Sequence, residues 1–151
     1  MIYTINEARN GIFDNVKFYN ESSTNNKWKY KIELADQGVF DKLEKDFNIK
    51  IPKALRNFIK DHNAATPQKY HFKVGNIERV FGAVLSFNKK DMDNIFSVLK
   101  SFKYENKIPF AVDPFGNLIV YSGGNIEFWN HETDIFTKVG NSLNSFIESL
   151  Y

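Results

Sequence analysis

Apolar residues recur along this chain with two periods, and each period predicts one kind of element. A period of two predicts a strand, because alternate side chains of an extended chain point to opposite faces, whereas apolar residues at i, i+3, i+4 and i+7 predict a helix. We expect strands at Val16–Asn20, Lys27–Leu34, Tyr70–Val74, Val80–Phe87, Ile108–Asp113, Leu118–Tyr121, Ile126–Trp129 and Ile135–Val139. We expect helices at Asp36–Phe47, with Asp36 as N-cap, at Pro52–Asn63, between Asn88 and Phe102, and at Leu143–Leu150, with Asn141 or Ser142 as N-cap.

Turn residues join these elements and predict their arrangement. Asp113, Pro114, Gly116 and Asn117 form a structural turn, in which Pro presets φ, Gly takes the left-handed position and the Asp carboxylate accepts the freed amides. Short connections of this kind imply a mainly antiparallel sheet, and single apolar stripes imply that the helices pack on one face of it. We therefore expect an α+β fold in one domain over residues 1–151, with an N-terminal hairpin at about 15–34.

Composition narrows the possible classes of protein. The absence of Cys excludes thiol catalysis and cysteine metal clusters, and suits a reducing compartment. The opening MIYTINEARNG has no basic stretch followed by an apolar run, and no apolar run approaches the roughly 18 residues of a membrane span. We interpret the protein as cytoplasmic. The net charge is +2, and the only arginines are Arg9, Arg56 and Arg79, so a nucleic-acid partner is not expected.

Residues that could carry catalysis form no recognisable pattern in the sequence. His62, His71 and His131 have neither the i, i+4 spacing of a zinc protease nor a fixed carboxylate companion. Several Asp residues fall at a helix start or at turns, where the backbone explains them, and the Glu residues have ordinary surface spacing. We expect no catalytic residue, no metal and no cofactor. A small enzyme whose site is assembled from distant residues stays open as an alternative.

Three segments together resemble the SMI1/KNR4 family of the SUKH superfamily. The first is the helix pair Val39–Phe47 and Ile51–Phe58, with an acidic end, a short break and an apolar-Pro start. The second is the strand and turn IPFAVD, residues 108–113, with Gly116–Asn117. The third is the hairpin Asn125–Trp129 leading to the helix Leu143–Leu150. The resemblance covers about residues 36–150 and depends on the order and spacing of the three segments.

The resemblance implies a bacterial immunity protein that binds and neutralises a cognate polymorphic or contact-dependent toxin domain. It also leaves a second possibility, a non-catalytic regulatory or scaffolding module that binds other proteins. No binding residue can be transferred from the family, since its partner surfaces vary. From the residues alone we expect partner contacts at Tyr70, His71 and Arg79, and at Trp129 and His131, because these polar or aromatic side chains have no evident place in the core.

Overall fold

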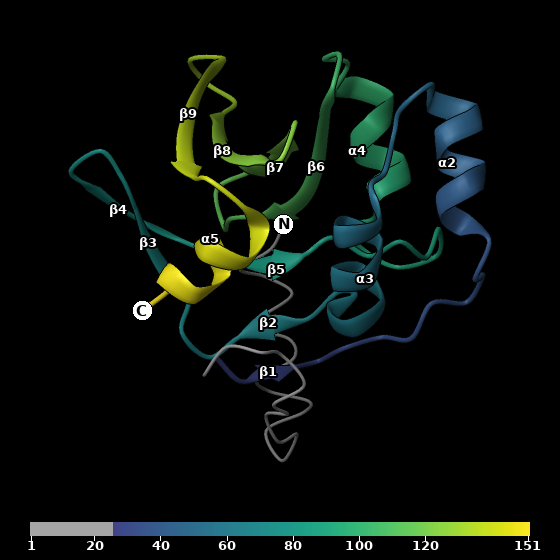
Figure 1. The fold of residues 1–151 in the computed structure, drawn as a ribbon, viewed down its shortest axis with the longest axis horizontal. Helices are drawn as coiled ribbons and strands as arrows, with labels where there is room; N and C mark the ends of the chain where they lie inside the picture. The colour runs from purple at the N-terminus through teal and green to yellow at the C-terminus, as the bar shows by residue number, and fades with distance from the viewer. Residues whose placement is uncertain (1–25) are drawn as a thin grey trace.

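A five-stranded antiparallel sheet in the order β5-β6-β7-β8-β9 forms the largest sheet of the computed structural model, which describes residues 26–151 (Figure 1). Its strands are β5 (Ala83–Val84), β6 (Lys107–Val112), β7 (Leu118–Ser122), β8 (Asn125–Asn130) and β9 (Ile135–Gly140). Smaller two-stranded sheets pair β1 (Trp28–Lys29) with β2 (Thr66–Pro67) and β3 (His71–Val74) with β4 (Ile77–Val80). The helices are α2 (Val39–Phe47), α3 (Lys53–His62), α4 (Ile95–Ser101) and α5 (Leu143–Ser149).

The expected α+β class with a mainly antiparallel sheet is confirmed. Strands β6 to β9 follow one another as hairpins, as their turn residues predict, and Gly123 and Gly124 both adopt positive φ between β7 and β8. Helix α5 begins after Ser142, whose hydroxyl accepts from the Ser145 N–H in a capping box. The predicted strand Val16–Asn20 lies outside the described residues.

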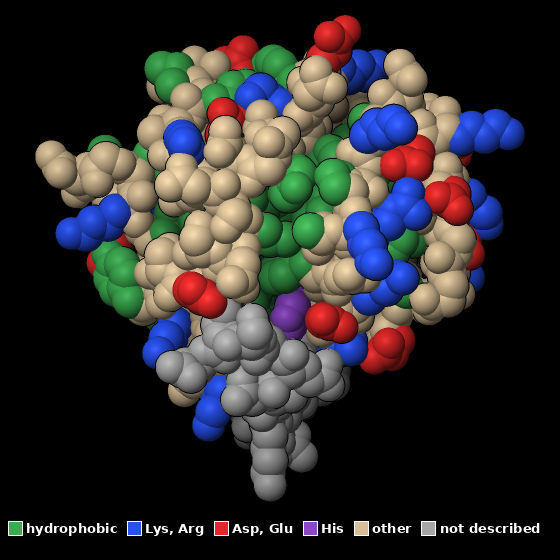
Figure 2. Space-filling model, in the orientation of Figure 1, with side chains coloured by type: hydrophobic (Ala, Val, Ile, Leu, Met, Phe, Trp, Pro, Cys, Tyr) green, Lys and Arg blue, Asp and Glu red, His purple; other side chains and the backbone are tan. Residues whose placement is uncertain are grey.

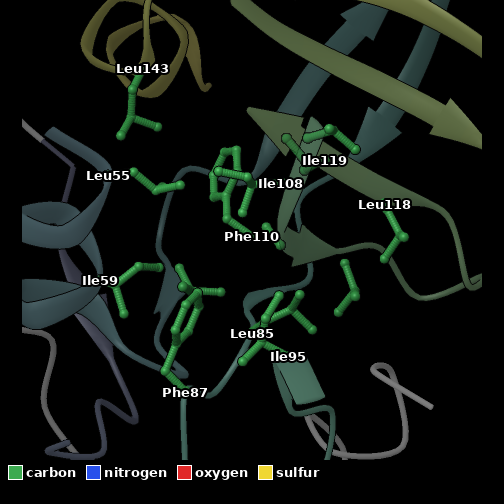
Figure 3. Packing of buried hydrophobic residues seen from close by; sticks show 14 of the residues in the cluster. Leu55, Ile59, Leu85, Phe87, Ile95, Ile108, Phe110, Leu118, Ile119 and Leu143 are labelled. Carbon is green, nitrogen blue, oxygen red and sulfur yellow. The ribbon is translucent and has the colours of Figure 1, made fainter. Parts of the chain in front are cut away.

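The hydrophobic core lies between the sheet and the helices. Figure 3 shows Leu55 and Ile59 of α3 directed toward Phe110 of β6, with Leu143 of α5 above them. The helices cover the sheet unevenly. Helices α2, α3 and α4 lie together on the β6 side of the molecule, whereas α5 packs against β8 and β9 (Figure 1). The two faces of β8 have different neighbours, because Phe128 packs against Phe72 and Trp129 packs against Phe102 at the end of α4.

The strand expected at Lys27–Leu34 is much shorter in the structure, where only Trp28–Lys29 is extended and paired. Tyr30 has a φ of 68°, in the left-handed region, which ends the strand. Beyond it, Ile32 is held by Asn63, whose side-chain amide donates to the Ile32 carbonyl at 2.9 Å. A polar side chain from a distant helix end therefore replaces the strand partner that the alternation had suggested.

The strand expected at Val80–Phe87 is divided between two sheets. Gly75, with a φ of 62°, and Asn76 make a two-residue turn, so the return strand begins at once as Ile77–Val80. The chain then leaves β3 and pairs with β6 through Ala83–Val84. The sequence prediction placed this return too late, because Ile77 and Glu78 are exposed and give no alternating apolar signal.

Two helices start later than expected, and capping explains both. Helix α2 begins at Val39 after Gly38, and the Asp36 carboxylate accepts from the Gly38 N–H rather than from the first turn. Helix α4 begins at Ile95, because Asn94 caps it by accepting from the Ser97 N–H at 2.8 Å. Met92 is consequently outside the helix.

Candidate partner-binding surfaces

The first group of candidate residues lies where the β3–β4 hairpin meets the last residue of the chain. Tyr70 is 41% exposed, and its ring lies 4.3 Å from the His71 ring, centroid to centroid. The His71 ring in turn stacks on Tyr151 at 5.8 Å. Two backbone hydrogen bonds hold Tyr151 beside His71, at 2.9 and 3.1 Å. The result is a row of three rings on the surface, which we call the Tyr70–Tyr151 stack.

A carboxylate anchors one end of the Tyr70–Tyr151 stack. The Tyr151 hydroxyl donates to Glu78 Oε2 at 2.8 Å, and this bond raises the pKa of the Tyr151 phenol above its ordinary value. Tyr151 is 49% exposed, so its ring remains available to a partner. The rings are therefore accessible and also restrained, a combination that reduces the entropy lost when a partner binds them.

Arg79 belongs to the same hairpin but lies on its other face. Arg79 pairs across the strands with Phe72, so both side chains point toward the main sheet. Its guanidinium lies 5.0 Å from the centroid of the Phe128 ring, at cation–π distance. Arg79 is half-buried, unlike the exposed Tyr70.

The second group of candidate residues is built around Trp129. Its ring packs among Phe102, Tyr104 and Phe136, with centroids 5.2 to 6.3 Å away. The Trp129 Nε1–H donates to Asp134 Oδ1 at 2.7 Å, and the Tyr104 hydroxyl donates to the same oxygen at 2.5 Å. These two bonds lower the pKa of Asp134. Trp129 is half-buried, so it supports the sheet as well as reaching the surface.

His131 is tied to the turn at Asp113–Asn117. The buried Asp113 carboxylate accepts from the Phe115 and Asn117 N–H groups at 2.9 and 2.8 Å, and from the Asn117 side chain at 2.9 Å. Asn117 Oδ1 then accepts from the His131 N–H at 3.1 Å and lies 2.8 Å from His131 Nδ1. The β6–β7 turn thus sets the position of the His131 ring at the start of the β8–β9 turn.

The structure does not bring the two candidate groups together. Phe128 and Trp129 are neighbours on β8, so their side chains point to opposite faces of the sheet. Arg79 contacts Phe128, whereas His131 lies 6.4 Å from Trp129, ring to ring. A partner of ordinary size that covers the Tyr70–Tyr151 stack would therefore meet the β3–β4 hairpin rather than the Trp129 face.

Sequence reasoning missed three residues of these surfaces. Tyr151 completes the ring stack, while Tyr104 and Asp134 hold Trp129. Tyr151 carried no usable signal, because it lies four residues after Ile147 and so continues the apolar stripe of the last helix. Tyr104 carried none, since its bond to Asp134 joins positions 30 residues apart, and Asp134, five residues from Trp129, was explained as a turn residue.

The rest of the described surface includes charges of both signs and a groove beside the end of α2. Figure 2 shows Lys, Arg, Asp and Glu intermixed over the side of α2 and α3, and hydrophobic side chains in a hollow between α5 and α3. A groove of about 430 Å³ runs between the end of α2 and the segment from α4 to β6. Within residues 26–151, no three His, Asp or Glu side chains come close enough to hold a metal ion. None of the described helices has both the length and the apolar content to cross a membrane.

The turn at Gly116 allows a direct test of its backbone geometry. Gly116 has a φ of 89°, and a Cβ added there would lie 3.5 Å from His131 Cε1. Because a β-branched residue resists positive φ, we expect Gly116→Val to lower the free energy of unfolding by about 1–3 kcal/mol in urea denaturation. Gly116→Ala should cost less than Gly116→Val. A midpoint equal to that of the wild type would contradict this prediction.

With this geometry established, the chain can be placed among known proteins. It is an α+β domain with a five-stranded antiparallel sheet and an exposed aromatic surface beside the separate β3–β4 hairpin. A family model, SMI1 / KNR4 family (SUKH-1), matches residues 34–149, and the chain belongs to this family. The family is generally associated with immunity to polymorphic toxins and with non-catalytic proteins. No curated protein and no solved structure matches the chain significantly.

Proposed function

We propose that this protein is a bacterial immunity protein, which binds a cognate polymorphic or contact-dependent toxin domain in the cytoplasm and neutralises it. The observation that carries the proposal is membership of the SUKH-1 family over residues 34–149. Neutralisation of this kind needs a preformed surface with a few anchoring side chains, because a tight complex gains most of its affinity from few residues. It requires no catalytic group in the immunity protein itself.

The Tyr70–Tyr151 stack is the surface that best fits this requirement. Tyrosine is enriched among the residues that dominate binding energy, since it offers a large rigid ring and a polar tip. Here two tyrosines stand on either side of His71, and Glu78 fixes the outer one. Ile77, at the tip of the same hairpin, is also exposed, on the face of the hairpin that carries Arg79. We therefore propose that the toxin domain docks on the β3–β4 hairpin.

The net charge of +2 bears on the chemistry of the partner. Immunity proteins that cover a basic nucleic-acid groove need a strongly negative surface, because complementary charge steers association. This chain has no such excess of acid. The proposed partner is therefore a toxin domain with a neutral or acidic contact surface.

Co-expression tests the proposed function. The toxin domain to use is the C-terminal domain of a large secreted protein encoded beside this gene, and growth of the host is the readout. We expect the wild-type protein to restore growth and to form a complex with the toxin domain. Failure of the wild type to restore growth or to bind would overturn the proposal, and binding without neutralisation would favour the regulatory module.

The Tyr70–Tyr151 stack can be tested in the same assay. We expect Tyr70→Ser to weaken binding of the toxin domain about tenfold or more, because it removes an exposed ring from the proposed contact. Phe115→Ser is the matched control, since Phe115 is 70% exposed but lies in the β6–β7 turn. Equal affinities for the two variants would place the interface away from the β3–β4 hairpin.

A further inference from the structure

Arg79 differs from the other described arginine in having no acceptor for its charge. The Arg56 guanidinium contacts Asp41 at 3.0 Å and Glu44 at 2.9 Å, and Arg56 also donates to the Ile51 carbonyl. Within residues 26–151, the side chain of Arg79 makes neither an ion pair nor a hydrogen bond, and its Nε is buried without an acceptor. A buried donor left without a partner is destabilising and is rare in folded proteins, so such a group calls for an explanation.

The fold nevertheless holds the Arg79 guanidinium in a definite place. Its ring partner, Phe128, is buried in the core and contacts Phe72, the residue paired with Arg79 across the hairpin. A guanidinium stacked on an aromatic face loses part of its hydration and of its rotamer freedom. Arg79 is thus positioned before any partner arrives, but its charge is not neutralised.

The nearest charged residues along the chain do not face Arg79. Lys73 and Glu78 pair with each other in register, on the face of the hairpin opposite to the Phe72–Arg79 pair. Glu78 is occupied by the Tyr151 hydroxyl on that face. The carboxylate adjacent to Arg79 in the sequence is therefore turned away from it, and the one lysine of the hairpin is turned away as well.

We propose that Arg79 receives a carboxylate, an Asp or Glu side chain of the toxin domain, when the complex forms; this inference rests on the function proposed above. The planar guanidinium matches a carboxylate with two parallel N–H donors, and a pre-positioned arginine is a frequent source of binding energy. A nucleic-acid phosphate fits less well, because phosphate backbones are bound by several cations together and Lys73 lies on the other face of the hairpin.

Affinity measurements on charge variants test this assignment. We expect Arg79→Gln to weaken binding of the toxin domain about 30-fold or more, which corresponds to a hot-spot residue. The affinity of Arg79→Lys should fall between those of the wild type and Arg79→Gln, since lysine keeps the charge but lacks the planar guanidinium fork. Lys60→Gln is the control, because Lys60 is an exposed lysine of α3 outside the hairpin, and it should change affinity less than about threefold, as is usual for exposed charges. Circular dichroism and thermal melting of each variant verify the fold.

The toxin carboxylate that contacts Arg79 can be identified by the same affinity measurements. We expect an Asp→Asn or Glu→Gln change in the toxin domain that weakens binding of the wild type but not of Arg79→Gln, the sign of a direct pair in a double-mutant cycle. Wild-type affinity for a folded Arg79→Gln variant would overturn the assignment while leaving the proposed function standing. Failure of the wild-type protein to bind the toxin domain would instead overturn the proposed function.

A second measurement keeps the assignment testable without the toxin domain. In the full chain, the Nε–H signal of Arg79 can be followed by NMR during titration with sodium acetate, with sodium chloride at equal ionic strength as the reference. We expect acetate to shift the Arg79 signal more than that of Arg56, whose acceptors are already in place. Equal shifts for the two arginines, or a larger response of Arg79 to inorganic phosphate than to acetate, would overturn the assignment.

Discussion

Replacing Asn63 by Ala is expected to lower the free energy of unfolding by about 2–5 kcal/mol, a large part of the stability of an ordinary domain. Asn63 follows the last turn of α3 and is 0% exposed. Its Oδ1 accepts from the Phe87 N–H at 2.7 Å, and its Nδ2 donates to the Ile32 carbonyl at 2.9 Å. Alanine removes both partners, so two backbone groups lose their hydrogen bonds, at about 1–3 kcal/mol each.

The effect of the Asn63 change should extend through a buried polar network. Asn63 Nδ2 also donates to Ser86 Oγ at 3.3 Å, and the Ser86 hydroxyl donates to Asp91 at 2.6 Å. Asn88 continues the network, because its side chain bonds Asp91, the Glu33 carbonyl and the Ala35 N–H. The segment before α2 is therefore fastened to the rest of the domain by side-chain amides.

Urea denaturation measures the Asn63 effect. Asn57→Ala is the control, because Asn57 is an exposed residue of the same helix and should change stability by less than about 0.5 kcal/mol. A loss below 1 kcal/mol for Asn63→Ala, with an unchanged denaturant dependence, would show that water replaces the amide at this position.

The contrast between β6–β9 and the residues before α2 shows how far the sequence can be interpreted. Strands β6 to β9 were predicted within one or two residues, because each pairs with its neighbour in the chain and the turn residues between them are local signals. Residues 30–34 were predicted as strand, but their conformation depends on Asn63 and Asn88, which bond Ile32 and Glu33 from 31 and 55 residues away. No local pattern can encode such a contact.

In the candidate surfaces, too, contacts between residues far apart in the sequence could not be predicted from local patterns. Tyr70 and His71 stood out because they have no evident place in the core, and the structure places both at the surface beside each other. Tyr151 joins them over a separation of 80 residues, which only the fold can bring about. Trp129 was expected on the outside, but Phe102 and Tyr104 cover part of its ring, since the segment after α4 crosses that face of the sheet.

Acidification is expected to destabilise the domain by up to about 3 kcal/mol between pH 6.5 and 4 through the single residue His62. His62 ends α3, is 3% exposed, and stacks on Trp28 at 4.3 Å and against Phe58 at 5.0 Å. Burial, with a smaller contribution from Lys31, lowers the pKa of His62 from 6.5 to about 4. The imidazole is therefore neutral in the folded protein at neutral pH.

The sign of this pH dependence follows from the protons bound by each state. Between pH 6.5 and 4 the unfolded chain binds a proton at His62 and the folded chain does not, so stability is complete above pH 6.5 and falls by at most about 1.4 kcal/mol per pH unit below it. The lowered pKa values of Asp36, Glu44 and Asp134 act in the same direction, but from below the ordinary carboxyl values. His62 accordingly dominates the upper part of the window.

Urea denaturation at a series of pH values from 7.5 to 4.5, together with an NMR titration of the His62 ring, measures this effect. We expect His62→Phe, which keeps a ring against Trp28 but cannot bind a proton, to lose most of the slope between pH 6.5 and 5 whatever its stability at pH 7.5. The variant separates proton binding from packing, because a packing defect shifts the whole curve and leaves its slope in place. A wild-type curve that is flat over this range, or a variant curve with the wild-type slope, would mean that another group carries the proton.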